Sequence, residues 1–98
     1  MLVKIHNSYR SIISLCDSDL IGKTFEEGIK TIFVNPNFFK GEEKTEKEAI
    51  EIIEIGRAED YTFNIVGKEA VRLALKTGII KQEGIQEIQG IPVALSLL

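Results

Sequence analysis

TEKEAIEIIEIGRAEDYTFNIVGKEAVRLALKTG, residues 45–78, places one strand-like segment between two helical patterns. Thr45 and Glu48 have the spacing of a capping box, in which the hydroxyl accepts from the N3 amide and the glutamate reaches back. Apolar residues follow at helical spacing: Ala49, Ile50, Ile52 and Ile53. Gly56 falls near the expected C-cap. The pattern predicts a helix over residues 45–57 with an acidic, solvent-facing side.

The rest of this stretch predicts a strand and a second helix. YTFNIV, residues 61–66, is rich in β-branched and aromatic residues, which favours a strand. GKEAVRLALKTG, residues 67–78, has helical periodicity and stops at Gly78. Its expected apolar face consists of Ala70, Val71, Ala74 and Leu75.

Segments on both sides of this stretch have strand character. LVKIH (2–6) and SIISLC (11–16) flank a four-residue turn and predict an N-terminal β-hairpin. The short alternation in LVKIH does not decide whether Leu2 or Val3 faces the core. Asp17 or Ser18 can cap a short helix or turn that closes at Gly28.

The remaining segments complete the expected sheet. Residues 29–34 predict a strand that Pro36 ends, because proline cannot donate to a ladder. The tail after Gly78 predicts short strands broken at Gly84 and Gly90. The 98 residues therefore predict a single α+β domain, residues 1–98. We expect a small mixed or antiparallel sheet with an N-terminal hairpin and two main helices packed on it.

Composition indicates an ordinary globular protein, with 44% apolar and 28% charged residues. No apolar run approaches the ~20 residues needed to span a bilayer, and the N-terminus lacks a signal-peptide pattern. We therefore expect a cytoplasmic protein with no membrane partner. Cys16 is the only cysteine, so it cannot form an intramolecular disulfide, and its apolar surroundings predict a small buried side chain.

Charge limits the possible partners. The net charge is −3, and residues 41–60 hold eight acids against three basic residues. A protein that binds nucleic acid mainly through phosphate contacts is expected to be basic. Any nucleic-acid site must therefore be local, on a face that excludes the acidic segment.

Gly22-Lys23-Thr24 matches the end of a nucleotide-binding P-loop, but the rest of the motif is missing. The motif needs a glycine five residues before Gly22, and Asp17 occupies that position. The residues after Gly28 have the pattern of a strand, whereas a P-loop is followed by a long helix. The sequence therefore predicts no ATP or GTP binding, with Lys23 exposed in a turn.

Catalytic and metal-ligating patterns are also missing from the sequence. His6 is the only histidine, and one histidine with one cysteine does not make a zinc site without carboxylates. Chemistry would need convergent acid, base or nucleophile groups. We therefore expect no enzyme activity, no catalytic residues, no metal and no cofactor.

Two segments offer candidate binding residues. Phe38 and Phe39 stand beside Lys40, and adjacent side chains of an extended chain point opposite ways. We therefore expect one ring to be exposed on the same face as Lys23, where it would stack on a base. The alternative is that both rings pack under the acidic helix.

Asn64 and Gly67 form the second candidate segment. Asn64 leads through the end of a strand to Gly67, which begins the second helix. Free amides at that helix N-terminus would bind an anion. The alternative is an ordinary loop-to-helix cap.

Four short motifs in this order, LIGKTFEEG, NFFKGE, FNIVGKEAV and GIPVAL, resemble the archaeal family catalogued as domain of unknown function 424. The resemblance covers nearly the whole chain. It implies a compact α+β domain, an archaeal source and an association with RNA or translation. The matching positions are Gly22, Lys23, Phe39, Gly41, Asn64, Gly67 and Pro92. A histidine commonly follows the proline in this family, and Val93 takes its place here.

These observations lead to two function hypotheses. The first is a non-enzymatic archaeal accessory protein associated with RNA, the ribosome or translation, with rRNA or ribosomal and translation proteins as partners. Its candidate contact residues are Lys23, Phe38, Phe39, Lys40, Asn64 and Gly67. The alternative is a protein–protein interaction module that uses the acidic helix within residues 42–60 and makes no nucleic-acid contact.

Overall fold

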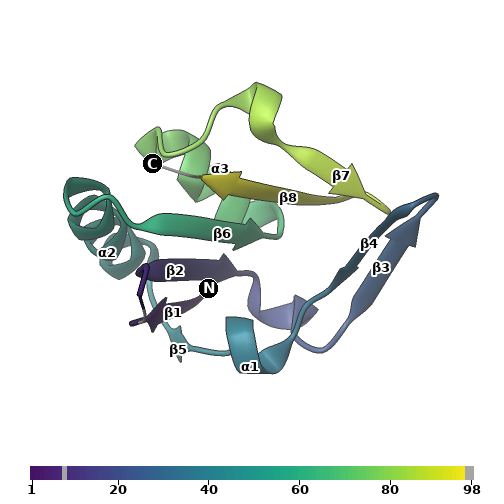
Figure 1. The fold of residues 1–98 in the computed structure, drawn as a ribbon, viewed down its shortest axis with the longest axis horizontal. Coiled ribbons are helices and arrows are strands. Elements are labelled where there is room, and N and C mark those ends of the chain that lie inside the picture. Colours follow the sequence, from purple (N-terminus) through teal and green to yellow (C-terminus); the bar gives the residue numbers. More distant parts are fainter. Residues whose placement is uncertain (8, 97–98) are drawn as a thin grey trace.

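The computed structural model describes residues 1–7 and 9–96. Within that part of the chain, a six-stranded sheet has the strand order β5-β1-β2-β6-β8-β7 (Figure 1). In chain order its strands are β1 (Leu2–His6), β2 (Ile12–Cys16), β5 (Glu42–Glu43), β6 (Thr62–Val66), β7 (Gln86–Ile88) and β8 (Ile91–Ser96). β2 and β6 pair in parallel and the other neighbours pair antiparallel, so the sheet is mixed.

The N-terminal hairpin is confirmed, with Leu2 opposite Cys16 and His6 opposite Ile12. Val3 belongs to the core on one face of the sheet, and Leu2 packs against the core on the other. The alternation in β1 did not favour either residue because both faces of the sheet are covered at this point. Both side chains therefore find apolar neighbours.

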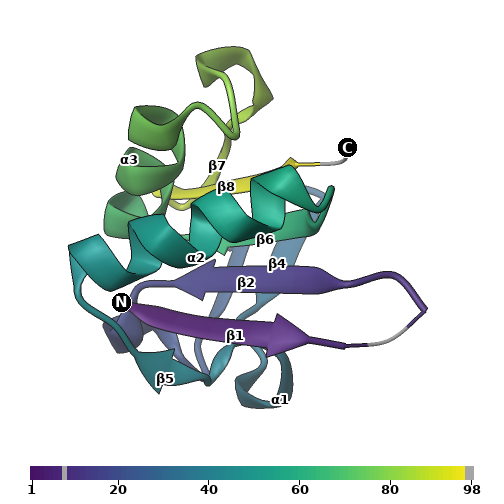
Figure 2. The ribbon, with the colours of Figure 1, turned by 90° about the vertical axis from the view of Figure 1, so that its left-hand side faces the viewer.

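Helices α2 (Glu46–Ala58) and α3 (Lys68–Thr77) confirm the two predicted helices and cover one face of the sheet; Figure 2 shows α2 in front of the sheet and β4 behind it. The capping box is formed, with the Glu48 amide 3.2 Å from the Thr45 hydroxyl and the Thr45 amide 3.0 Å from the Glu48 carboxylate. The largest fully buried side chains between the helices and the sheet are Ile13, Leu15, Ile53, Phe63, Ile65 and Leu73. Each such side chain stabilises the fold by about 1.5–3 kcal/mol.

Gly56 lies inside α2 rather than at its C-cap, because the helix continues to Ala58. A Cβ at this position would lie 2.6 Å from Cδ1 of Ile13 and 3.0 Å from Cζ of Phe63. The glycine therefore allows the end of α2 to approach the sheet closely. Gly56 is thus near the C-cap Glu59, as expected, but it serves packing rather than helix termination.

The other face of the sheet carries a β-ribbon and short helical turns. β3 (Thr24–Glu27) and β4 (Lys30–Phe33) form a two-stranded ribbon among the described residues, followed by helix α1 (Pro36–Phe39). A 3₁₀ turn, η1 (Ser18–Leu20), precedes the ribbon. These elements and the sheet enclose a second, smaller core of Cys16, Leu20, Val34, Phe39 and Val66.

The short helix or turn expected between Asp17 and Gly28 is wrong beyond Leu20. Residues 24–27 are a strand, and Gly28 turns the ribbon with φ 63°. Phe25 lies opposite Ile32 in the ribbon, and both pack against the second core. This tertiary contact outweighs a local helical turn. The strand expected in residues 29–34 is confirmed as β4.

The tail forms the 3₁₀ turn η2 (Gln82–Gly84) and the β7–β8 hairpin, which confirms the strand break at Gly90. Gln89 and Gly90 both have positive φ, as a tight hairpin turn requires. Among the described residues, no helix has the length and apolar character needed to cross a membrane.

Candidate functional site

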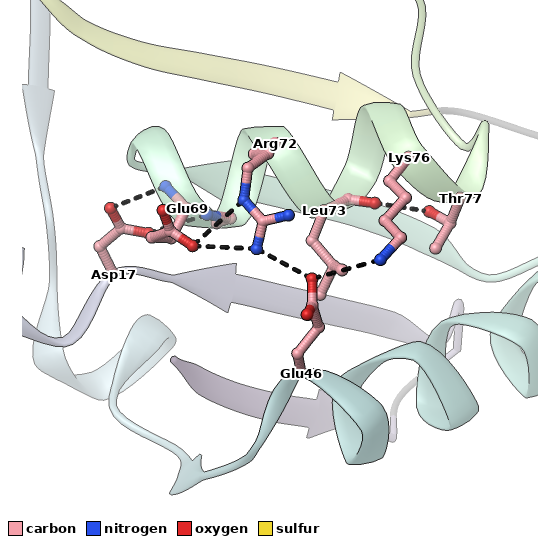
Figure 3. Close-up of polar contacts among 8 residues, drawn as sticks. Asp17, Glu46, Glu69, Arg72, Leu73, Lys76 and Thr77 are labelled. Atoms are coloured by element: carbon pink, nitrogen blue, oxygen red, sulfur yellow. Dashed lines mark hydrogen bonds and ion pairs between the residues drawn. The ribbon is translucent and has the colours of Figure 1, made fainter.

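The N-terminus of α3 holds the carboxylate of Asp17, which Figure 3 shows pointing at the first turn. One oxygen accepts from the Ala70 amide at 2.8 Å and the other from the Glu69 amide at 3.1 Å. The anion site predicted at Gly67 is therefore filled by the chain's own side chain. The alternative interpretation, a helix cap, is correct, although the capping carboxylate lies 52 residues before the Glu69 amide rather than in the preceding loop.

The geometry of this cap explains the glycine. Gly67 has φ 110°, a conformation that residues with a Cβ rarely adopt. A Cβ would also lie 2.3 Å from Cγ of Asp17. Gly67 is buried and its amide donates to Pro92 O, so it presents no exposed contact surface.

A charged network joins the same end of α3 to the start of α2 (Figure 3). Arg72 contacts Glu46 at 2.9 Å and Glu69 at 3.0 Å, and Lys76 lies 3.7 Å from Glu46. Arg72, with Lys76 beside it, lowers the pKa of Glu46. The pKa of Glu48 is also lowered, by its hydrogen bonds in the capping box. The carboxylates that begin the acidic helix are therefore already engaged within the protein.

Neither phenylalanine forms the exposed platform that we expected. Phe39 is 7% exposed in the second core, and Phe38 is half-buried with its ring 4.4 Å from that of His6. The expectation assumed an extended chain, whereas Asn35 caps a helical turn with Pro36 at its first position. Consecutive residues in a helix lie about 100° apart, so both rings can reach the sheet. They pack on the face opposite α2, so the alternative placement under the acidic helix is also wrong.

The two candidate lysines lie outside this core. Lys23 is exposed in the turn before β3, and Lys40 is exposed at the C-terminal end of α1. No hydrogen bond or ion pair joins either ammonium to another described residue. The Gly22 amide donates to Val34 O and the Lys23 amide to Leu20 O, so this turn leads into a strand with its amides occupied. It does not have the strand-to-helix geometry of a P-loop.

A groove of about 430 Å³ lies on the open part of this sheet face. Asn64 and Leu95 are paired neighbours on its floor, as are Val93 and Gln86. Ile32 from the ribbon and Phe39 from α1 also line it. The groove thus brings together two predicted residues, Phe39 and Asn64, but not Phe38, Lys23, Lys40 or Gly67.

The groove is uncharged and has free amide groups. None of the described residues that line it carries a charge. The half-buried Asn64 side chain forms no hydrogen bond with another described residue, and neither does that of Gln86. Leu95 is 54% exposed. Sequence reasoning missed Ile32, Gln86 and Leu95, although their alternation within short strands was the signal for one shared face.

Cys16 and His6 are both engaged in packing or hydrogen bonding within the fold. Cys16 is fully buried, which confirms its prediction as a small core residue, and burial together with Asp17 raises its pKa to about 12. His6 Nε2 lies 2.9 Å from the carbonyl oxygen of Phe38, which also accepts from the Ser14 hydroxyl at 3.1 Å. A carbonyl only accepts, so this imidazole nitrogen is the donor. Among the described residues, no group of three or more acidic, cysteine or histidine side chains is arranged to hold a metal ion.

The fold and the groove define a small mixed-sheet α+β domain with a ligand-sized depression on its open sheet face. The chain belongs to the family described as "Protein of unknown function (DUF424)", whose model matches residues 5–97. This confirms the resemblance found in the sequence. No curated protein matches the chain.

A solved structure confirms the fold. The chain is similar to an uncharacterized conserved protein from Methanopyrus kandleri, with a TM-score of 0.83 and 23% sequence identity. The match covers 98% of this chain and 90% of that one. At this identity the likeness establishes the shared α+β architecture.

Proposed function

We propose that this protein is a non-enzymatic cytoplasmic interaction module that binds a segment of a partner protein in the groove on its open sheet face. The uncharged lining of the groove carries the proposal. Apolar side chains from Ile32, Val93 and Leu95 suit an aliphatic residue of the partner. The free carboxamides of Asn64 and Gln86 suit the amides of a peptide backbone.

This proposal moves the interaction surface away from the acidic helix. Glu46 is bound to Arg72, Glu48 closes the capping box, and Glu54 lies 3.7 Å from Arg57. A basic partner would compete with these internal contacts. The groove has no such internal partner to displace, and about 430 Å³ lies within the usual range of 300–1,000 Å³ for binding sites.

Association with RNA, the ribosome or translation is the rival hypothesis, and the groove supplies little for it. Phosphate binding needs cations, and the described residues lining the groove include none. Phe39 is too buried to stack on a base. Lys23 and Lys40 are exposed, so their substitution gives the rival hypothesis its own test.

The experiment compares tagged wild-type chain with Leu95→Glu in extracts of its source organism, with and without RNase. Leu95→Glu places a charge in the groove, while Ile29→Glu is the matched control at an exposed residue outside it. We expect a protein partner that survives RNase, is retained by Ile29→Glu and is lost with Leu95→Glu. A partner insensitive to Leu95→Glu contradicts the proposal. An RNase-sensitive partner that is lost with Lys23→Ala or Lys40→Ala supports the RNA hypothesis instead.

A further inference from the structure

A second surface lies at the edge of the sheet, on β1. β5 pairs only with Leu2 and Val3, opposite Glu43 and Glu42. From Lys4 onward, β1 therefore has no strand neighbour on that side among the described residues. Exposed edges of this kind pair with extended chains, because their backbone donors and acceptors are available.

Beside this edge is a notch of about 510 Å³ between β1, α2 and the segment 40–44. Its apolar surface comes from Val3, Ile5 and Ile52, and Ile5 is 47% exposed. Ile55, 62% exposed, lies three residues beyond Ile52, a spacing that puts both on one side of the helix. An apolar surface therefore lies beside the edge. Every second side chain of an added strand would point toward it.

The charges around the notch are mainly positive. Its lining includes Lys4, Lys40 and Lys44 with a single described carboxylate, Glu42. Lys44 contacts Glu42 at 2.9 Å, and the Lys4 ammonium is bound to Asn37 O, so Lys40 supplies the unpaired charge. Lys40 forms no ion pair with another described residue. A notch with this balance attracts an acidic segment and repels a basic one.

Lysines on an edge strand often serve only to prevent aggregation. Lys4, however, folds toward the opposite sheet face and donates to Asn37 O at 2.7 Å. Ile5 thus remains uncovered beside it. The combination of an open edge, exposed isoleucines and the unpaired Lys40 goes beyond what protection against aggregation needs.

We propose that the edge of β1 binds an extended acidic segment of a partner protein, which adds to the sheet as a strand and places an apolar side chain over Ile5 and Ile52. This surface is separate from the groove, whose described lining shares no residue with the notch. Its experiment therefore stands or fails independently of the proposed function.

The test titrates the full chain with a synthetic ten-residue peptide of alternating valine and glutamate, followed by NMR and calorimetry. We expect binding with amide shifts and slowed hydrogen exchange at residues 4–7. Lys40→Glu should weaken binding about tenfold at low salt, and Lys68→Glu, an exposed lysine of α3 outside the notch, should leave it unchanged. Leu95→Glu should also leave it unchanged, because Leu95 lies in the groove.

Two control peptides separate strand addition from charge attraction. N-methylation of alternate amides keeps the charge and removes the backbone donors, so it should abolish binding. Lysine in place of glutamate should also abolish it. Equal binding of either control overturns the proposal, as does a shift map centred on the groove. A dimer of the chain itself that blocks β1 and is lost with Ile5→Lys also overturns it, because the occupant would then be a second copy.

Discussion

The two faces of the central sheet differ in how they are covered. On one face, two regular helices bury a continuous core in which Ile53, Phe63 and Leu73 are fully buried. On the other, a two-stranded ribbon and short turns enclose the smaller core around Val34 and Phe39. The second cover is incomplete and leaves the groove open.

Under the proposed function, this difference corresponds to a division between stability and binding. Long amphipathic helices can seal a sheet face, because each turn contributes side chains to the same layer. A ribbon and a single helical turn cover only the strands directly beneath them. Polar side chains such as Asn64 can therefore lie on the open face with their amide groups accessible. We expect substitutions on the helix-covered face to affect mainly stability and those on the open face to affect mainly binding.

Ile53→Ala should produce the largest effect. Ile53 lies on the buried face of α2, and truncation of such a side chain costs about 2–4 kcal/mol in the free energy of unfolding. Glu51→Ala on the exposed side of α2 is the control, with an expected change below about 0.5 kcal/mol. Denaturant titration measures both. Equal midpoints would contradict the assignment of the buried helix face.

Gly67→Ala should destabilise the protein by about 1–3 kcal/mol, because the new methyl group combines backbone strain with a collision against Asp17. Asp17→Ala should cost about 1 kcal/mol through loss of the cap of α3. The double variant should be more stable than the sum of the two losses predicts, since removal of the carboxylate relieves the collision. Strict additivity would show that the two positions are not coupled.

Leu95→Ala should change stability by less than about 1 kcal/mol, because the side chain is already half exposed on the open face. The comparison with Ile53→Ala measures the contrast between the faces directly, and denaturant titration applies to both. A loss as large as that of Ile53→Ala would show that the groove is part of the folding core.

Arg72→Gln should have the smallest effect on stability but a clear effect on titration. Arg72 lowers the pKa of Glu46, so its removal should raise that pKa toward the ordinary value. A lowered pKa stabilises the fold above the unfolded-state pKa of about 4.3, and this contribution is lost as pH falls through the folded pKa. The variant should therefore lose less stability on acidification than the wild type. NMR titration of the carboxyl groups measures this shift. An unchanged Glu46 pKa in the variant would show that Arg72 is not what lowers it.

Local patterns in the sequence were sufficient to predict the two main helices. Thr45 and Glu48 predicted the start of α2 within one residue, and Gly78 predicted the end of α3. These signals involve residues within one turn of each other, so they do not depend on the tertiary fold. The family resemblance came from short motifs in a fixed order, and the family match confirms it.

Non-local contacts decided the features on which the candidate site depends. Asp17 caps α3 through amides 52 and 53 residues later in the chain, and Gly67 is required by that contact rather than by an anion. Phe38 and Phe39 are covered because a helical turn directs them at the sheet. No local pattern contains these partners, so sequence reasoning expected an exposed ring at residues 38–39 and free amides at the start of α3, where the structure has neither.

The sequence by itself determined the fold class, the positions of the main helices and the family. Hydrophobic periodicity and helix capping involve residues a few positions apart, so they can be recognised in the sequence without knowledge of any partner segment. Only the tertiary structure decided which residues share a surface. Asn64, Leu95 and Gln86 meet in the groove because strand pairing sets their register across distant segments. Register is a property of the whole sheet, and a shift of one residue would turn each of these side chains to the opposite face.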